Sequence, residues 1–395
     1  MKTNDSVHFW KWILTLVRAS NKTNPIDSHY NCFCEVCRKA SLSACEELSL
    51  LEFQTKFAAL IMSSHNRPHN DNDAGANLPP PLLPHVRDET VLEPFRYISN
   101  VPGKDVRGKL IDCFQLWFQV ESTAVLQSIK DIIGDLHNAS LLVDDIEDNS
   151  SLRRGIPVAH KVFGVPATIN CSSYAIFLAL EKVHALNNPQ AVQVFIGELL
   201  NLHRGQGQDI FWRDSMTCPT EEQYLQMVQD KTGGLFRLAV GLLQSFATKH
   251  QTNNFAPLVN NLAMYFQIRD DYINLADEEY MKSKSFCEDW TEGKFSFPIL
   301  HNIRQDPNDR RLWNILKQRT DDTDVKRYAQ RLMKESGSLK YTRDKCRDLM
   351  KDTVAGIEKV GNNEQLIKLL RLLDVQLDKL SGESIGERKT DVDEA

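Results

Sequence analysis

From about Val91 onward, apolar residues recur at spacings of three and four, which is the period of an amphipathic α-helix. The longest such segments are Ala124 to Asp148, Ala191 to Leu202, Glu221 to Ala247, Phe255 to Leu275 and Asn362 to Leu380. No run of alternating residues flanked by hairpin turns competes with them, and no repeat of roughly 20 to 50 residues indicates a solenoid. The pattern predicts an all-α bundle of some ten helices whose central members are apolar on most faces.

Residues 1–90 follow a different pattern. Residues 1–22 are basic and apolar, which fits either an amphipathic mitochondrial presequence or a weakly structured extension. The cysteines between residues 32 and 45 are spaced C-x-C-x2-C-x7-C, which lacks the paired spacing of most zinc sites. A polar stretch and a proline-rich LPPPLLP then fill residues 63–84, as in a linker. We predict a largely disordered extension and linker at 1–90, a helical catalytic domain at 91–385 and a charged tail at 386–395.

Composition narrows the class of protein without naming a function. Of the 395 residues, 42% are hydrophobic and 25% are charged, as in ordinary globular proteins. The formal net charge of −6 disfavours non-specific nucleic-acid binding, so a phosphorylated substrate would need local cations or metal ions. Nine cysteines, an odd number, fit a reducing compartment better than a disulfide scaffold. The apolar run from Trp12 to Val17 is too short for a stable membrane span.

The strongest chemical signal is the acidic run DDIED at residues 144–148, at the end of an apolar helical segment. On a helix, Asp144 and Asp148 are one turn apart and share a face, so their carboxylates can converge on one cation. Hard oxygen ligands of this kind suit Mg²⁺, which keeps waters and bridges to substrate phosphates. A solvated acidic helix end is the plainer interpretation of this motif when it is taken alone.

A second acidic run, DDYIN, occupies residues 270–274 at the end of another apolar helical segment. Asp270 and Asn274 share a face, and Gln267 lies three residues earlier on the same stripe. Two acidic helix faces that point at each other across a bundle would form a cavity for several divalent ions. We therefore expect a site in which metal ions neutralise a bound diphosphate.

Basic residues that a diphosphate would need are clustered around these two motifs. A lone Lys or Arg is most often a surface charge, and a lone His on an apolar helix is usually a core residue. Their proximity in sequence to the acidic runs favours a binding role instead. These candidates are Lys104, Arg107, His137, Arg153, Arg154, Lys284 and Lys294.

Residues 91–385 resemble the trans-isoprenyl diphosphate synthase family, and most closely its animal geranylgeranyl diphosphate synthases. The matching strings are VLEPFRYI, PGKDVRGKL, LHNASLLVDDIEDNSSLRRGIPVAH, GQGQDIFWRD, CPTEEQY, KTGGLF, FQIRDDYINL and KSFCEDWTEGKFSFP. The resemblance implies an isoprenoid-synthase-type bundle around a central active-site cavity, with two or three Mg²⁺ ions per site. It also implies a homo-oligomer.

The resemblance assigns roles to individual residues. By it, the metal ligands are Asp144, Asp148 and Asp270, and these three with Lys231 and Lys294 are the catalytic set. The isopentenyl diphosphate pocket is Lys104, Arg107, His137 and Arg154. The contacts of the allylic diphosphate are Arg153, Lys231, Thr232, Gln267, Lys284 and Lys294. One departure is Asn274, where the family's second motif often has Asp; a neutral amide oxygen is a weaker metal ligand.

The implied reaction is a head-to-tail condensation. The allylic C–O bond ionises, the alkene of isopentenyl diphosphate attacks the carbocation, and the proton is lost to the released diphosphate. An apolar interior excludes water that would quench the cation. The small residues Ala139 and Ser140, five and four positions before Asp144, replace the bulky aromatics of short-chain enzymes, so we expect a C20 product. Farnesyl diphosphate is the expected main allylic substrate, alongside the dimethylallyl and geranyl diphosphates.

Three alternatives remain open. A class I terpene cyclase shares the bundle and the first aspartate motif, but it needs no isopentenyl pocket such as G-K-x-x-R and R-R-G provide. A non-catalytic regulatory subunit usually loses an aspartate motif, and both are present here. A farnesyl diphosphate synthase is disfavoured by Ala139 and Ser140. The C-terminus carries neither a prenylation box nor a peroxisomal signal, so we expect a cytoplasmic enzyme, or a mitochondrial one if residues 1–22 act as a presequence.

Overall fold

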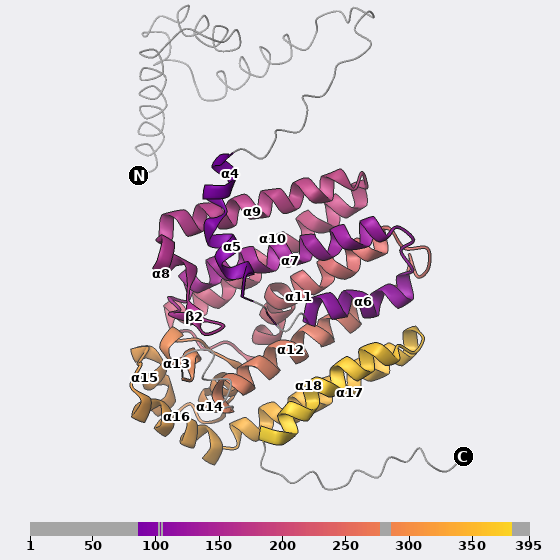
Figure 1. Ribbon diagram of the computed structural model, residues 1–395. Helices are drawn as coiled ribbons and strands as arrows, with labels where there is room; N and C mark the ends of the chain where they lie inside the picture. Colours follow the sequence, from indigo (N-terminus) through magenta and orange to yellow (C-terminus); the bar gives the residue numbers. More distant parts are fainter. Residues whose placement is uncertain (1–85, 102, 104–105, 277–285, 381–395) are drawn as a thin grey trace, which may run out of the picture. The chain divides into compact units, whose positions relative to one another are not determined.

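The computed structural model describes residues 86–101, 103, 106–276 and 286–380, with only the backbone at 86, 87 and 375–380. Within these ranges it holds fifteen α-helices and one short hairpin, which confirms the predicted all-α class (Figure 1). The predictions for residues 1–85, including the presequence, the cysteine cluster and the linker, lie outside the described residues. So do those for Lys104, Lys284 and the tail at 386–395.

The first half of the described chain contains three long helices. The helices are α4 (Val86–Val91), α5 (Glu93–Ser99), α6 (Val106–Phe118), α7 (Thr123–Glu147), α8 (Ala159–Phe163), α9 (Val165–Ala185) and α10 (Pro189–Ser215). Polar residues fix several starting points: Ser122 caps α7 through its hydroxyl, and Asn188 caps α10 immediately before Pro189. Helix α4 begins five residues before the predicted domain boundary at 91.

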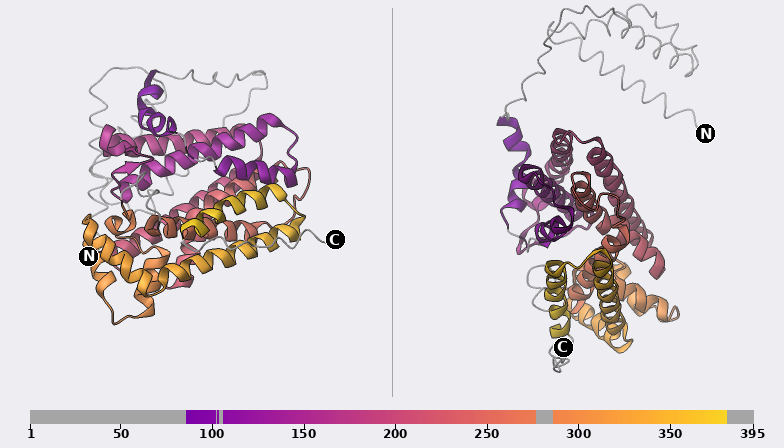
Figure 2. Two further views of the ribbon diagram at one scale, coloured as in Figure 1. Left: turned by 60° about the horizontal axis from the view of Figure 1, so that its bottom comes forward. Right: turned by 90° about the vertical axis from the view of Figure 1, so that its right-hand side faces the viewer.

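The second half begins with the two helices that complete the centre of the bundle. Its helices are α11 (Glu221–Ser245), α12 (Ala256–Ala276), α13 (Glu288–Glu292), α14 (Phe297–Gln305), α15 (Arg311–Gln318), α16 (Thr323–Glu335), α17 (Ser338–Val360) and α18 (Glu364–Leu380). Helix α11 starts with a capping box in which Thr220 and Gln223 satisfy each other's backbone N–H groups. It contacts α6, α7, α10, α12 and α14, so it lies at the centre of the core (Figure 2).

Glycine permits the closest approach in the bundle, between α10 and α11. A Cβ atom built at Gly205 would lie 2.3 Å from the backbone nitrogen of Lys231 and 2.8 Å from its Cα atom. A Cβ at Gly234 would lie 3.1 Å from the carbonyl oxygen of Glu198. Side chains from the facing surfaces of these two helices are therefore held unusually near to each other.

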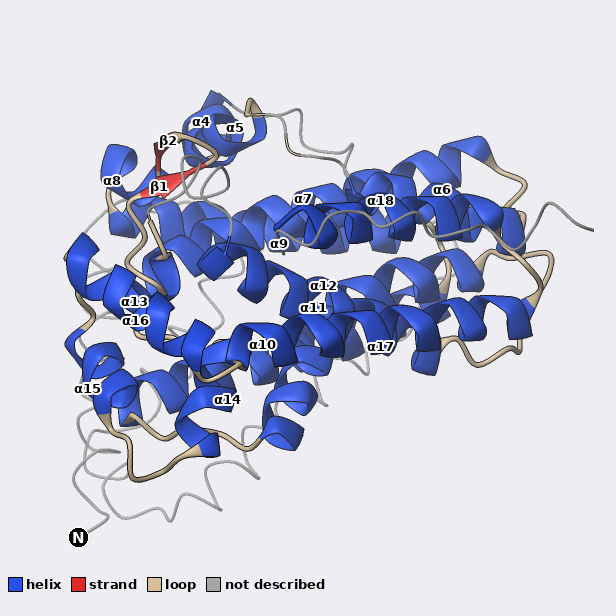
Figure 3. Ribbon diagram, turned by 90° about the horizontal axis from the view of Figure 1, so that it is seen from below, coloured by secondary structure: helices blue, strands red, loops and turns tan. Residues whose placement is uncertain are grey.

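Both aspartate motifs lie at the same end of the bundle. Helices α7 and α12 run towards the end that carries the hairpin and the short helices α13 to α16 (Figure 3). Residues 144–147 form the last turn of α7, and residues 270–276 form the last two turns of α12. The two predicted acidic faces, on α7 and α12, thus lie at the end of the bundle that holds α13 to α16.

One element was absent from the prediction. Strands β1 (Leu152–Arg153) and β2 (Ile156–Pro157) pair antiparallel through a two-residue turn at Arg154 and Gly155. Both turn residues have positive φ, 54° and 81°, as a type I′ turn requires. Two-residue strands are too short to show alternation, and an arginine at the first turn position gives no turn signal.

Candidate active site

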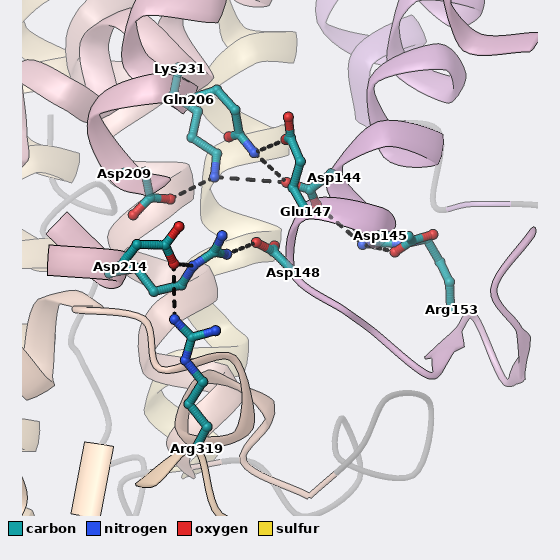
Figure 4. Close-up of polar contacts among 11 residues, drawn as sticks. Asp144, Asp145, Glu147, Asp148, Arg153, Gln206, Asp209, Asp214, Lys231 and Arg319 are labelled. Carbon is teal, nitrogen blue, oxygen red and sulfur yellow. Dashed lines mark hydrogen bonds and ion pairs between the residues drawn. The ribbon is translucent and has the colours of Figure 1, made fainter. Parts of the chain in front are cut away.

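The first acidic motif divides its carboxylates between two sides of α7 (Figure 4). Asp144 and Asp148 remain partly accessible, with side chains 27% and 11% exposed. Asp145 is 1% exposed and accepts a hydrogen bond of 2.6 Å from Nε of Arg153. Asp144 and Asp148 therefore share an accessible face, as their spacing predicts, while Asp145 anchors the hairpin. Their role as metal ligands stays a prediction.

Lys231 meets Asp144 from the opposite side of the bundle. Its Nζ lies 2.7 Å from Oδ2 of Asp209 and 3.8 Å from Oδ1 of Asp144 (Figure 4). Burial acts to lower the pKa of Lys231, but the carboxylates of Asp209, Asp144 and Asp148 together outweigh it and raise this pKa, so the lysine stays protonated. The absent side chain of Gly205 is what allows Lys231 to stand here.

Arg153 is the second cation beside Asp144. Its Nη2 lies 3.3 Å from Oδ2 of Asp144 while its Nε holds Asp145. Both predicted contacts of the allylic diphosphate that can be placed near the first motif, Arg153 and Lys231, thus flank the same carboxylate. A phosphate bridged to Asp144 by a metal ion would lie within reach of both.

The second motif also separates its two carboxylates. Asp271 is buried and accepts hydrogen bonds from Nε2 of Gln267 at 2.9 Å, from the backbone nitrogen of Phe297 at 2.8 Å and from the hydroxyl of Tyr224. Asp270 is partly exposed, and its carboxylate acts on Arg107. Asp271 therefore fastens α12 to α11 and α14, while Asp270 faces the predicted site.

Thr232, Lys294 and Asn274, which the sequence analysis also singled out, all lie close to the second motif. Thr232 donates a hydrogen bond of 2.7 Å to Oε1 of Gln267, which joins α11 to α12. Lys294 is surrounded by carboxylates; burial opposes its charge, but Asp209 and Asp271 raise its pKa well above the usual value. Asn274 is buried, and its Oδ1 accepts a weak hydrogen bond of 3.4 Å from the backbone nitrogen of Asp289. Its amide therefore links α12 to α13.

The predicted isopentenyl diphosphate residues form a separate cationic group. Nη1 of Arg107 lies 3.0 Å from Nε2 of His137, and Nη1 of Arg154 donates to the carbonyl of Val101 at 2.6 Å. Burial and the neighbouring Arg154 lower the pKa of Arg107 to about 10, although Asp270 acts in the opposite direction. Crowded guanidinium groups of this kind are stabilised by an anion, as a diphosphate headgroup would provide.

His137 is neutral in this setting. Burial, Arg107 and Arg154 lower its pKa to about 2, so the ring accepts the hydrogen bond from Arg107. In the unfolded chain the same ring titrates near pH 6.5. The folded state therefore loses stability as the pH falls below about 6.5, because only the unfolded chain takes up this proton.

We expect His137→Gln to remove this one-proton dependence while keeping an acceptor for Arg107. Between pH 6 and pH 5 the free energy of unfolding of the wild-type chain should fall by about 1.2 kcal/mol more than that of the variant. Urea denaturation at several pH values measures the difference. Equal slopes in the two proteins would mean that His137 is already protonated in the fold.

Several polar residues of the site were not assigned roles from the sequence. Nε2 of Gln206 donates to Oε2 of Glu147 at 2.6 Å and lies 3.4 Å from Oδ1 of Asp144. Asp209 holds Lys231, and Tyr224 holds Asp271. A signal was available, because Gln206 and Asp209 are three residues apart in GQGQD and so share a face if the helix continues past Leu202.

The donor set suits Mg²⁺. Within the described ranges, no three His, Cys, Asp or Glu side chains are grouped closely enough to hold a metal ion by themselves. Two carboxylates completed by substrate phosphate oxygens and water are what this ion usually takes. Burial and the neighbouring Asp144 raise the pKa of Asp148 well above its usual value, a cost that a cation between the two carboxylates would relieve.

A family model described as polyprenyl synthetase matches residues 88–333, and the chain belongs to this family. Members of the family typically use Mg²⁺. The geranylgeranyl pyrophosphate synthase of Mucor circinelloides f. lusitanicus is 50% identical over 289 residues, covering 73% of this chain and 94% of its own. The synthase of the same name from Dictyostelium discoideum is 50% identical over 287 residues, with the same two shares.

A third relative carries a different name at the same level of identity. It is a terpene synthase from Matsumurasca onukii, 50% identical over 283 residues, which cover 72% of this chain and 92% of the relative. Overall identity therefore does not separate condensation from terpene formation, and the binding residues must do so. The particular closeness to animal enzymes stays a prediction.

Proposed function

We propose that the chain is a geranylgeranyl diphosphate synthase, which condenses isopentenyl diphosphate with an allylic diphosphate. The observation that carries this proposal is the presence of two groups of basic residues, each suited to one diphosphate. One is the first aspartate motif with Lys231 and Arg153, and the other is the pair of guanidinium groups of Arg107 and Arg154 with the neutral ring of His137. A condensation needs two diphosphates bound at once, whereas an ionisation followed by cyclisation needs one.

In the proposed mechanism, each polar residue acts on one part of the two substrates. Bound Mg²⁺, which we expect at Asp144, Asp148 and Asp270, would neutralise the charge that develops on the leaving diphosphate. Lys231 and Lys294 bind the same diphosphate. Further predicted contacts of this group are Arg153, Thr232, Gln267 and Lys284. The number of metal ions, two or three, stays a prediction.

The new bond then forms between the two substrates. Arg107, His137, Arg154 and Lys104 orient isopentenyl diphosphate so that its alkene faces the allylic carbon. Thr232 and Gln267, which are hydrogen-bonded to each other, direct oxygen dipoles at the allylic cation. The C–O bond of the allylic diphosphate breaks, a C–C bond forms, and the released diphosphate takes the proton lost by the isopentenyl unit.

A measurement of diphosphate release distinguishes this proposal from the terpene synthase alternative. The full chain is incubated with Mg²⁺ and farnesyl diphosphate, with and without isopentenyl diphosphate, and in parallel with EDTA. We expect release only when isopentenyl diphosphate and Mg²⁺ are both present. Release without isopentenyl diphosphate would favour the terpene synthase, and no release under any condition would overturn both proposals.

Ser140 is the residue that we expect to permit the C20 length. It lies one turn before Asp144 on the same face of α7, and its hydroxyl bends back to the carbonyl of His137 at 2.8 Å. Ala139 is fully buried, and its carbonyl accepts a hydrogen bond from Ser172 of α9, so it packs against a neighbouring helix. Of the two small residues, Ser140 therefore borders the path of the growing tail.

Replacing Ser140 with phenylalanine should shorten the product. The aromatic ring would fill space below Asp144, so we expect C15 to replace C20 as the main product, with the C20 share reduced about tenfold. Chromatography of the dephosphorylated products measures this ratio. Ser140→Ala, which keeps the side chain small, should leave it unchanged, and an unaltered C20 share in the phenylalanine variant would exclude Ser140 from length control.

Cellular properties remain proposals. Among the described residues, no helix is both long and apolar enough to cross a membrane. The homo-oligomeric state, the absence of nucleic-acid binding and the cytoplasmic location expected from the sequence stay predictions.

A further inference from the structure

Asp148, one of the proposed metal ligands, has a cationic partner that the sequence did not predict. Nη1 of Arg213 lies 2.5 Å from Oδ1 of Asp148, and the Arg213 side chain is only 9% exposed. Arg213 lies in the last turn of α10, whereas Asp148 ends α7, so the ion pair crosses the site. A charge-assisted hydrogen bond this short and this well screened from water holds its carboxylate firmly.

Two further charged side chains, Asp214 and Arg319, extend this ion pair into a chain of contacts. Nε of Arg213 lies 3.3 Å from Oδ1 of Asp214, and Nη2 of Arg319 lies 2.9 Å from the same oxygen (Figure 4). Arg319 follows α15 and rests against Gly293, where a Cβ atom would be 3.0 Å from its Nε. The four side chains alternate in sign from Arg319 through Asp214 and Arg213 to Asp148.

Asp214 remains a charged acceptor throughout the neutral pH range. Burial acts to raise the pKa of Asp214, but hydrogen bonds and charge from Arg319 and Arg213 together outweigh it and lower this pKa. Arg213 keeps its charge as well, because Asp148 and Asp214 raise its pKa against the effect of burial. The Arg213 guanidinium therefore contacts two carboxylates, Asp148 at 2.5 Å and Asp214 at 3.3 Å.

A divalent cation at the first motif would bind the same Asp148 carboxylate whose Oδ1 Arg213 contacts. A guanidinium and a metal ion compete for such an oxygen, because both are cations and their close approach is repulsive. We propose that Arg213 holds Asp148 in the metal-free protein and competes with Mg²⁺ for it, and that Asp214 receives Arg213 when the metal binds. This inference rests on the proposed function, since it takes Asp148 as a metal ligand. Arg213 is thus a positioning residue that sets the metal affinity.

Changes at Arg213 and Asp214 should shift metal affinity in opposite directions. Mn²⁺ titrated into the full chain at pH 8 without substrates, and followed by electron paramagnetic resonance of the free ion, measures this affinity directly. Arg213→Gln removes the competing cation, so we expect Mn²⁺ to bind about fivefold more tightly. Asp214→Asn removes the alternative partner, so binding should be about threefold weaker. Arg204→Gln, on an exposed face of the same helix, should leave it unchanged.

Thermal unfolding supplies an independent readout. In EDTA, Arg213→Gln should melt below the wild type, because Asp148 loses its short ion pair while the repulsion from Asp144 one turn away remains. Added Mn²⁺ should raise the melting temperature of this variant by more than it raises that of the wild type. A purely structural role for Arg213 would lower stability and metal affinity together.

The result that overturns the inference is distinct from the one that overturns the metal site. Asp144→Asn tests the site itself, and unchanged Mn²⁺ binding in that variant would contradict the proposed function. If Asp144→Asn weakens binding while Arg213→Gln fails to tighten it, only the role given to Arg213 is wrong. Should Arg213→Gln not fold, Asp214→Asn decides alone, and equal or tighter binding there would overturn the inference.

Discussion

Asp144→Ala should lower the rate of condensation by about 10³-fold and leave the fold intact. The variant loses a carboxylate that faces both Arg153 and Lys231, and with it half of the proposed metal-binding face of α7. Stability should hardly change, because removing Asp144 also removes its repulsion of Asp148 one turn away. Steady-state kinetics with saturating Mg²⁺ and a urea denaturation curve give both quantities.

Asp131→Ala is the matched control, since Asp131 is an exposed carboxylate on the same helix, bonded only locally to Gln127. We expect this variant to keep the wild-type rate. A wild-type rate in Asp144→Ala would contradict the metal assignment, and an unfolded Asp144→Ala would mean that the carboxylate is needed for the fold.

Gly205→Ala should destabilise the protein and inactivate it together. The added Cβ would approach the backbone of Lys231 to 2.3 Å at its nitrogen and 2.8 Å at its Cα atom, and backbone cannot move aside as a flexible side chain can. Helices α10 and α11 would have to separate, which overpacking data put at about 3 kcal/mol. Lys231 would then move away from Asp144 and Asp209, so activity should fall in the protein that still folds.

Gly207→Ala isolates this effect from helix propensity. Gly207 is two residues further along α10, and a Cβ atom added there would have no neighbour within 4 Å, so alanine should stabilise the helix by up to about 1 kcal/mol. Urea denaturation of both variants is the measurement. If both shift in the same direction and by the same amount, the close contact at Gly205 does not govern the packing of α10 on α11.

The sequence predicted helices best where their surroundings are apolar. The expected segments at 124–148, 221–247 and 255–275 agree with α7, α11 and α12 to within two residues at each end. The segment at 191–202 was too short, because α10 continues to Ser215. Beyond Leu202 the helix turns Gln206 and Asp209 towards the site, and a helix that lines a polar cavity loses the apolar periodicity used to recognise it.

In the candidate site, too, local sequence patterns predicted some features and missed others. Spacing on a helix was sufficient to select Asp144 and Asp148 over Asp145, because the helical period alone decides which side chains share a face. The partners came from other helices, and Arg213 and Tyr224 gave no local signal of the carboxylates they contact. Contacts between distant segments depend on how helices pack, which hydrophobic periodicity does not encode.

Electrostatics explains how so many charges can be gathered in one place before a substrate arrives. Asp144, Asp148 and Asp209 each have a cationic side chain within 4 Å, and Asp271 is held by three hydrogen-bond donors. Buried carboxylates left without such partners would be costly. The basic residues thus stabilise the carboxylates in the fold, and two of them, Arg153 and Lys231, are the proposed contacts of the allylic diphosphate.

The most direct test of the central claim is the chain length of the product. The purified full chain is incubated with Mg²⁺, isopentenyl diphosphate and, separately, dimethylallyl, geranyl or farnesyl diphosphate, and the products are separated by length. We predict that C20 geranylgeranyl diphosphate accumulates and that farnesyl diphosphate is the best of the three acceptors. A C15 end product would contradict the predicted length, and a hydrocarbon formed without consumption of isopentenyl diphosphate would contradict the proposed reaction.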